Sequence, residues 1–146
     1  MLPDGPSGTD RKPASWAPAV EGDEDPTGLD FTGTPEPNGK LRLTTLVEGD
    51  GPPVEEGQTV YVNYLGQVYG AKKPFDASYE REPFSFTVGG GEVVEGWDTL
   101  LEGVPVGSRV LIAVPPDQGY GKAGNPDAGI KGTDTLYFVI DVLAAV

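Results

Sequence analysis

The groups that could do chemistry in this chain are carboxylates, hydroxyls, aromatic rings and a few Lys and Arg side chains, because histidine and cysteine are absent. A Ser-His-Asp triad, a thiol nucleophile, a disulfide framework and a zinc site of Cys and His are therefore excluded. Asp, Ser and Thr are plentiful, but no residue stands out as the base for a nucleophile. Any activity must depend on these remaining groups or on the shape of a pocket.

Three further kinds of site are disfavoured by the residues around them. The glycine run at residues 89–91 is typical of a phosphate loop, but no Lys-Ser/Thr pair follows it and Glu92 would repel an anion. The acidic cluster at residues 21–25 lacks the spacing of a calcium loop. A glycosidase with two carboxylates is formally possible, but the domain is small for one and its acidic residues resemble a solvated surface.

The remaining unusual feature is a set of aromatic residues on predicted loops and strand edges. Phe75 is followed directly by Asp76, and Tyr120 lies between two glycines. A domain of this size needs aromatic residues in its core, so the core is the alternative place for each of them. Together they could line an apolar pocket with a few polar groups, which is the usual composition of a small-ligand site. The set is Tyr64, Phe75, Phe84, Phe86, Trp97, Tyr120 and Phe138.

The elements that must position these residues are strands and one short helix. Val93, Trp97, Leu100 and Leu101 are spaced as one face of a helix about two turns long. Alternating apolar and β-branched residues predict strands at 41–47, 59–69, 84–88, 109–114 and 135–143. The last of these is continuously apolar, which predicts a central strand covered on both faces. The predicted fold class is α+β, with an antiparallel half-barrel of about five strands wrapped around the helix.

Residues 1–38 differ in composition from the rest of the chain. They are rich in Pro and Gly, and their apolar residues Trp16, Leu29 and Phe31 are isolated from one another. Such a segment buries too little apolar surface to offset the entropy cost of ordering it. The sequence therefore predicts a disordered, acidic tail or linker over residues 1–38, followed by one folded domain over residues 39–146.

The formal net charge of −13 argues against binding nucleic acid, which needs clustered Lys and Arg residues. No apolar run approaches the roughly 18–20 residues that span a bilayer. The first residues lack the basic and apolar regions of a signal peptide. We expect a cytoplasmic, monomeric protein without a membrane span, and the alternative is an exported fragment of a longer protein.

Six sequence blocks in residues 39–146 together form a specific pattern. The blocks are Val62-Asn63-Tyr64-Leu65-Gly66, Phe75-Asp76-Ala77-Ser78, Pro83-Phe84-Ser85-Phe86, Val93-Val94-Glu95-Gly96-Trp97, Pro115-Pro116-Asp117-Gln118-Gly119-Tyr120-Gly121 and Leu136-Tyr137-Phe138. They resemble the FKBP family of macrolide-binding peptidyl-prolyl cis-trans isomerases. They occur in the family's order and at nearly its spacing, so together they are highly specific although each alone is weak. The resemblance implies a bent antiparallel sheet, with the helix across its concave face and a pocket between them.

The resemblance also implies roles for individual residues. Catalytic roles are implied for Asp76, Tyr120 and Phe138. Substrate-binding roles are implied for the residues that match pocket walls and floor, namely Tyr64, Phe75, Phe84, Val93, Val94, Trp97 and Ile130. The link from Asp76 to Pro83 is one residue shorter than in the family, so neither Glu80 nor Arg81 is matched to the basic residue that often contacts the acid. Asn125 stands where many relatives have His.

The function implied by the resemblance is rotation about X-Pro peptide bonds in polypeptides, which would assist protein folding. Because no bond breaks in this reaction, no cofactor, metal or covalent intermediate is expected. The implied partners are X-Pro-containing polypeptides and macrolide inhibitors. The alternative from another class is a binding module that retains the pocket and works as a chaperone or receptor without useful turnover.

Overall fold

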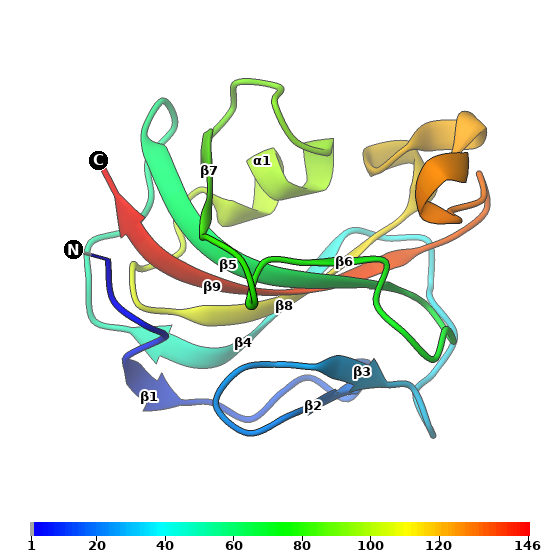
Figure 1. Ribbon diagram of the computed structural model, residues 1–146, viewed down its shortest axis with the longest axis horizontal. Helices are drawn as coiled ribbons and strands as arrows, with labels where there is room; N and C mark the ends of the chain where they lie inside the picture. The colour runs from blue at the N-terminus through cyan, green and yellow to red at the C-terminus, as the bar shows by residue number, and fades with distance from the viewer. Residues whose placement is uncertain (1) are drawn as a thin grey trace.

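The fold is built on one strongly curved antiparallel sheet, as the computed structural model of residues 2–146 shows (Figure 1). Met1 lies outside the described residues. The long strands are β4 (Arg42–Gly49), β5 (Thr59–Val68), β8 (Arg109–Val114) and β9 (Leu136–Ala145). They pair in the order β4-β8-β9-β5, and the short strand β7 (Phe84–Thr87) also pairs with β5. The five predicted strands and the α+β class are thus confirmed.

Strand β9 is central, as its apolar sequence predicts. It pairs with β8 along one side and with β5 along the other, and its first eight residues are all buried. Residues facing the helix, such as Phe138, Ile140 and Val142, belong to one hydrophobic cluster, and those facing away, such as Tyr137 and Val139, belong to a second. The sheet is therefore covered on both faces.

One short helix, α1 (Glu95–Leu101), lies over the concave face of the sheet (Figure 1). Trp97 and Leu101 are buried against the sheet, whereas Val93 precedes the helix and Val94 is its N-cap. A Cβ on Gly96 would lie 3.0 Å from side-chain atoms of Leu41 and Val114, so glycine at this position permits close packing of the helix on the sheet. No helix of residues 2–146 has the length and apolarity needed to cross a membrane.

The N-terminal segment, defined here as residues 2–38, is ordered on the convex face, so the prediction of a disordered tail is wrong. Strand β1 (Gly8–Asp10) extends the sheet beside β4, and β2 (Ala19–Glu21) pairs with β3 (Gly28–Asp30) in a separate hairpin. Figure 1 shows this hairpin on the side of the sheet opposite α1. Leu29 is only 2% exposed.

The prediction failed because the partners of these apolar residues lie far along the chain. Leu29 belongs to a cluster with Leu65, Leu111, Tyr137 and Val139 on the convex face, and Trp16 and Phe31 pack against that cluster. The Trp16 ring also lies under the Arg42 guanidinium, with 4.5 Å from its Cζ atom to the ring centroid. A segment that cannot form a core by itself is thus ordered by an apolar surface on the rest of the chain. The division of the chain into two parts at residue 38 stays a prediction.

Shorter elements occur in regions where the sequence predicts only loops. Strand β6 (Asp76–Ala77) pairs with β5 at Leu65 and Gly66. The long loop after β8 contains three 3-10 turns, η1 (Pro116–Gln118), η2 (Gly121–Ala123) and η3 (Pro126–Ala128). These elements matter for function because β6 carries Asp76 and η2 follows directly after Tyr120.

Candidate active site

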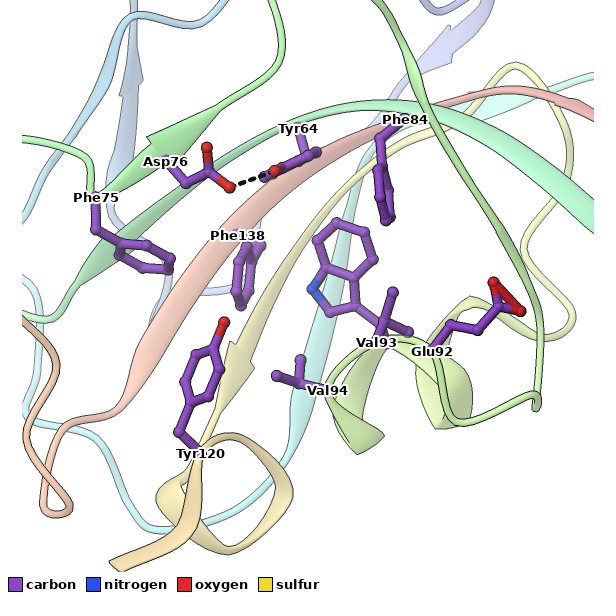
Figure 2. A pocket seen from close by; sticks show the side chains of 10 residues that line it. Tyr64, Phe75, Asp76, Phe84, Glu92, Val93, Val94, Tyr120 and Phe138 are labelled. Atoms are coloured by element: carbon purple, nitrogen blue, oxygen red, sulfur yellow. Dashed lines mark hydrogen bonds between the residues drawn. The ribbon is translucent and has the colours of Figure 1, made fainter. Parts of the chain in front are cut away.

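A cavity of about 180 Å³ lies between α1 and the concave face of the sheet (Figure 2). Nine of the ten residues to which the sequence assigned a role line it, and Glu92 completes the lining. They come from β5, β6, β7, β9, the start of α1 and the loop after β8, so the tertiary fold brings together segments from across the domain. The lining consists of Tyr64, Phe75, Asp76, Phe84, Glu92, Val93, Val94, Trp97, Tyr120 and Phe138.

Trp97 is both a core residue and part of the cavity lining. It is 4% exposed, and its ring stands edge-to-face with the rings of Tyr64 and Phe138, at centroid distances of 5.1 and 5.2 Å. Phe84 lies edge-on at 6.3 Å. Such perpendicular contacts are favourable because the positive edge of one ring meets the negative face of another. The core and pocket interpretations of Trp97 are therefore compatible.

Gly66 on β5 allows two of the lining rings to approach the backbone. A Cβ at this position would lie 2.6 Å from Phe138 Cε1 and 2.7 Å from Phe75 Cζ, much closer than van der Waals contact. The rings of Phe75 and Phe138 stand perpendicular to each other with centroids 5.7 Å apart. Only a residue without a side chain leaves room for this pair.

Asp76 forms the polar rim of the cavity, and its carboxylate accepts hydrogen bonds from the Ala77 N–H at 2.9 Å and from two side chains. The Tyr64 hydroxyl donates a hydrogen bond to Asp76 Oδ2, and Arg81 Nη2 donates to Asp76 Oδ1 at 2.9 Å. Arg81 also donates to the Ala77 carbonyl oxygen, which fixes the guanidinium beside β6. Arg81 is therefore the basic partner of the acid, which sequence comparison left unassigned because the link to Pro83 is short.

Tyr64 is a neutral hydrogen-bond donor at ordinary pH. Burial of its ring, followed by its hydrogen bond to the Asp76 carboxylate, raises the pKa of Tyr64 to about 12. Both causes disfavour the phenolate, the first by removing it from water and the second by placing a negative charge beside it. The phenol therefore keeps its proton and orients Asp76 across the physiological pH range.

Two further residues that line the cavity, Tyr120 and Val94, carry hydrogen-bond donors. Tyr120 is 38% exposed, and its hydroxyl points into the cavity toward Phe138 (Figure 2). Val94 is the N-cap of α1, so its backbone N–H has no partner in the helical hydrogen-bond ladder. A bound molecule could thus be held by rings on its apolar faces and by donors at one edge.

Two residues differ from the predicted site. Ile130 is 4% exposed and packs in the hydrophobic core, and it does not line the cavity. Its backbone N–H and carbonyl are paired with those of Asn125 in an isolated bridge. Glu92, which sequence reasoning missed, lines the cavity while its Oε2 accepts a hydrogen bond from the Thr87 N–H at 3.3 Å. Its place directly before the matched Val93-Val94 pair was the only available signal.

The glycine run at residues 89–91 is a turn held by a carboxylate. Asp98 Oδ1 accepts from the Gly89 N–H at 2.8 Å, and its Oδ2 accepts from the Gly91 N–H at 3.1 Å. Both N–H groups are thus occupied by an acidic side chain of α1, which is the opposite of a phosphate cradle.

Comparisons with known proteins agree with this geometry. Residues 51–143 match the family model of the FKBP-type peptidyl-prolyl cis-trans isomerases. The chain is 39% identical over 117 residues to an FK506-binding protein of Streptomyces anulatus, covering 80% of this chain and 94% of that one. It is 38% identical over 105 residues to peptidyl-prolyl cis-trans isomerase FKBP1A of Xenopus laevis, covering 70% of this chain and 95% of that one.

Solved structures give the same result. The crystal structure of AtFKBP13 superimposes with a TM-score of 0.65 at 32% identity and covers 73% of this chain and 93% of that one. A peptidyl-prolyl cis-trans isomerase of Pseudomonas syringae superimposes with a TM-score of 0.64 at 31% identity. This superposition covers 72% of this chain and 74% of that one. Some relatives are longer, and the chain spans only 29% of the 39 kDa FK506-binding nuclear protein of Drosophila melanogaster. The chain therefore belongs to the family of FKBP-type peptidyl-prolyl cis-trans isomerases and is an enzyme of that class.

Proposed function

We propose that the cavity binds the proline of an X-Pro segment and lowers the barrier to rotation about the X-Pro bond by desolvation and shape complementarity. The observation that carries this proposal is the composition of the cavity, which joins aromatic walls to hydrogen-bond donors at one edge. No covalent intermediate is part of the proposal, because rotation breaks no covalent bond.

The chemistry of the amide explains why such a cavity suffices. Rotation loses amide resonance and has a barrier of about 18–20 kcal/mol, so an X-Pro bond interconverts over tens of seconds or longer. The planar amide is more dipolar than the twisted one. Transfer from water into an apolar cavity therefore destabilises the ground state more than the transition state, and each 1.4 kcal/mol of difference is about a tenfold rate gain.

We assign the proline ring to the space between Phe84, Trp97 and Phe138. These rings are held by their mutual perpendicular contacts, so little ordering remains to be done when the substrate binds. The Tyr120 hydroxyl and the Val94 N–H are the proposed donors to substrate carbonyl groups. Donors fixed in advance stabilise the twisted amide without reorganising during the reaction.

Asp76 has the less direct role in this proposal. Both of its carboxylate oxygens already accept hydrogen bonds from protein groups, Tyr64 at one and Arg81 at the other. We infer that Asp76 mainly orients the rim of the cavity and presents a negative edge to the rotating carbonyl. Burial and ring contacts thus supply more of the rate enhancement than the charge does.

The proposed partners follow from the same cavity. Polypeptides with accessible X-Pro bonds are the substrates, which makes assistance to protein folding the biological role. The name of the Streptomyces relative records binding of FK506, and we propose that a macrolide of this kind occupies the same cavity here. A cytoplasmic location and a monomeric state are also part of the proposal.

The test is a proline-coupled peptide assay with micromolar protein, in which a protease cleaves only the trans form of a short X-Pro peptide. We expect acceleration over the uncatalysed rate and its loss when FK506 is added. A folded protein that binds FK506 without accelerating the reaction would reject the enzymatic proposal in favour of a binding module. A folded protein that neither binds FK506 nor accelerates the reaction would reject the assignment of the cavity as the substrate site.

A further inference from the structure

The N-terminal segment is joined to the active-site loop through one buried carboxamide, that of Gln67. This side chain is 0% exposed on the convex face of β5. Its Oε1 accepts a hydrogen bond from the Leu29 N–H at 2.9 Å, and its Nε2 donates to the Leu29 carbonyl oxygen at 2.9 Å and to the Ala71 carbonyl oxygen at 2.7 Å. One side chain thus links β3 to the loop between β5 and β6.

The chemistry of the carboxamide makes this link specific. Both N–H groups of Nε2 are used and both acceptors are carbonyl oxygens, so no other orientation of the amide satisfies all three bonds. A buried polar group that loses its partner carries the full cost of its desolvation. The position of β3 and the position of Ala71 are therefore coupled at Gln67.

The loop held in this way positions two residues of the cavity, Phe75 at its end and Asp76 directly after it. It runs from Tyr69 to Phe75 and leads directly into Asp76, and the Phe75 N–H donates to the Gly66 carbonyl oxygen at 2.9 Å. Gly66 is adjacent to Gln67 but lies on the other face of β5, where a Cβ would meet the rings of the cavity residues Phe75 and Phe138. Two adjacent residues of β5 therefore hold the loop from opposite faces of the sheet, Gln67 at Ala71 and Gly66 at Phe75.

The N-terminal segment also holds the beginning of the same loop. The Tyr69 hydroxyl donates to the Thr34 carbonyl oxygen at 3.1 Å, and the Tyr69 ring stands edge-on to Phe31 with centroids 5.2 Å apart. A hollow lined by β3 and by the loop residues Tyr69, Gly70, Ala71 and Lys72 lies between these contacts. The hollow indicates that the loop rests on the N-terminal segment at a few points and is not embedded in a continuous core.

We propose that Gln67 is a positioning residue, through which β3 fixes the loop and so places Phe75 and Asp76 at the cavity. This inference rests on the proposed isomerase function. It gives the N-terminal segment a role in the active site, although the segment lies on the opposite face of the sheet and does not line the cavity.

The first test is the substitution Gln67→Met, which keeps a similar length and removes all three hydrogen bonds. At a temperature where the variant is fully folded, we expect kcat/KM in the proline-coupled assay to fall roughly threefold to tenfold, since small displacements of positioned groups lower rates. Hydrogen–deuterium exchange should increase in residues 69–77. The amide chemical shifts of Phe75 and Asp76 should move, whereas those of Val93 and Val94 on the other wall should not.

The matched control is Thr44→Val. Thr44 Oγ1 accepts a hydrogen bond from the Ala14 N–H at 2.9 Å, so this variant also removes a bond between the N-terminal segment and the sheet, but at a point away from the loop. We expect its kcat/KM and its exchange in residues 69–77 to match those of the unsubstituted protein. An equal fall of kcat/KM in both variants would overturn the proposal, because it would mean that the segment acts only through general stability.

A milder variant keeps the proposal testable if Gln67→Met does not fold. Tyr69→Phe removes only the hydroxyl bond to Thr34, and we expect faster exchange in residues 69–77 with unchanged exchange in β8 and β9. Unchanged exchange in residues 69–77 of Tyr69→Phe, or unchanged kcat/KM and chemical shifts in folded Gln67→Met, would overturn the inference. If the unsubstituted protein shows no isomerase activity, the proposed function fails by itself, and the exchange and chemical-shift results still decide whether Gln67 positions the loop.

Discussion

Tyr64 connects the aromatic floor of the cavity to its polar rim, since its hydroxyl donates to Asp76 while its ring stands edge-on to Trp97 at 5.1 Å. The backbone of Tyr64 is itself held, because its N–H donates to Ser78 Oγ at 2.8 Å. The orientation of the carboxylate is thus set from inside the cavity by a residue of the central sheet.

Replacing Tyr64 with phenylalanine should separate these two roles. Tyr64→Phe keeps the ring contacts and removes the hydroxyl bond, so the free energy of unfolding should fall by only about 1 kcal/mol. The proline-coupled kcat/KM should fall more than this loss of stability explains, because Asp76 Oδ2 then loses its hydrogen bond and the carboxylate is held only at Oδ1, by Arg81 and the Ala77 N–H. Urea unfolding and the kinetic assay on the same preparation provide the comparison. An unchanged kcat/KM would mean that orientation of Asp76 does not matter.

The raised pKa of Tyr64 predicts a loss of stability at alkaline pH. The pKa is 10.0 in a model compound and about 12 in the folded protein, where burial and then the Asp76 bond favour the neutral phenol. Because the folded pKa is the higher one, this contribution to stability is complete below pH 10 and is lost as the pH rises toward 12. Urea unfolding between pH 9 and 12 should therefore show a steeper fall for the unsubstituted protein than for Tyr64→Phe. If the unfolding free energies of the two proteins fell in parallel with pH, a raised pKa of Tyr64 in the folded protein would be contradicted.

Asp76→Asn should reduce activity far more than stability. The ion pair with Arg81 is solvent-exposed, with 44% of the Asp76 side chain and 61% of the Arg81 side chain accessible, and such pairs contribute about 0–1 kcal/mol. The matched control is Arg81→Met, which removes the same pair and keeps the carboxylate at the cavity. We expect a larger fall in kcat/KM for Asp76→Asn, and equal falls would show that Asp76 acts only as the partner of Arg81.

Gly66→Ala should damage both stability and activity. The added methyl group would lie 2.6 Å from Phe138 Cε1 and 2.7 Å from Phe75 Cζ, so one or both rings must move. Overpacking of this kind costs about 1–3 kcal/mol, and here the displaced rings line the cavity. Thermal unfolding and the kinetic assay measure the two effects. Gly5→Ala, whose Cβ would have no atom within 4 Å, serves as the control and should behave like the unsubstituted protein.

Leu29→Ala tests whether the N-terminal segment is packed on the sheet in solution. Leu29 is 2% exposed among Leu65, Leu111 and Tyr137, and truncation of such a side chain costs about 2–5 kcal/mol. We expect a loss in this range from urea unfolding. A loss below about 0.5 kcal/mol, the range of surface substitutions, would support the disordered tail that the composition predicts.

Patterns within single segments were sufficient to predict most of the fold. The alternation along β5 and the continuous apolar run of β9 are local consequences of which face of a strand is buried, and they need no knowledge of the partner strand. Nine of the ten assigned residues line the cavity because the resemblance rests on ordered blocks and not on single residues. Ile130 is the one assigned residue that packs in the core without lining the cavity, and its role in substrate binding stays a prediction.

The sequence by itself determined the five predicted strands of the main sheet, the short helix around Trp97 and the family to which the chain belongs. Only the tertiary structure decided that Arg81 is the partner of Asp76 and that Leu29 bonds to Gln67, 38 residues away along the chain. It also decided that the N-terminal segment is ordered. The physical reason is that periodicity reports the environment of a segment, whereas long-range pairing depends on which surfaces the folded chain brings together and on whether burial there offsets the entropy of ordering.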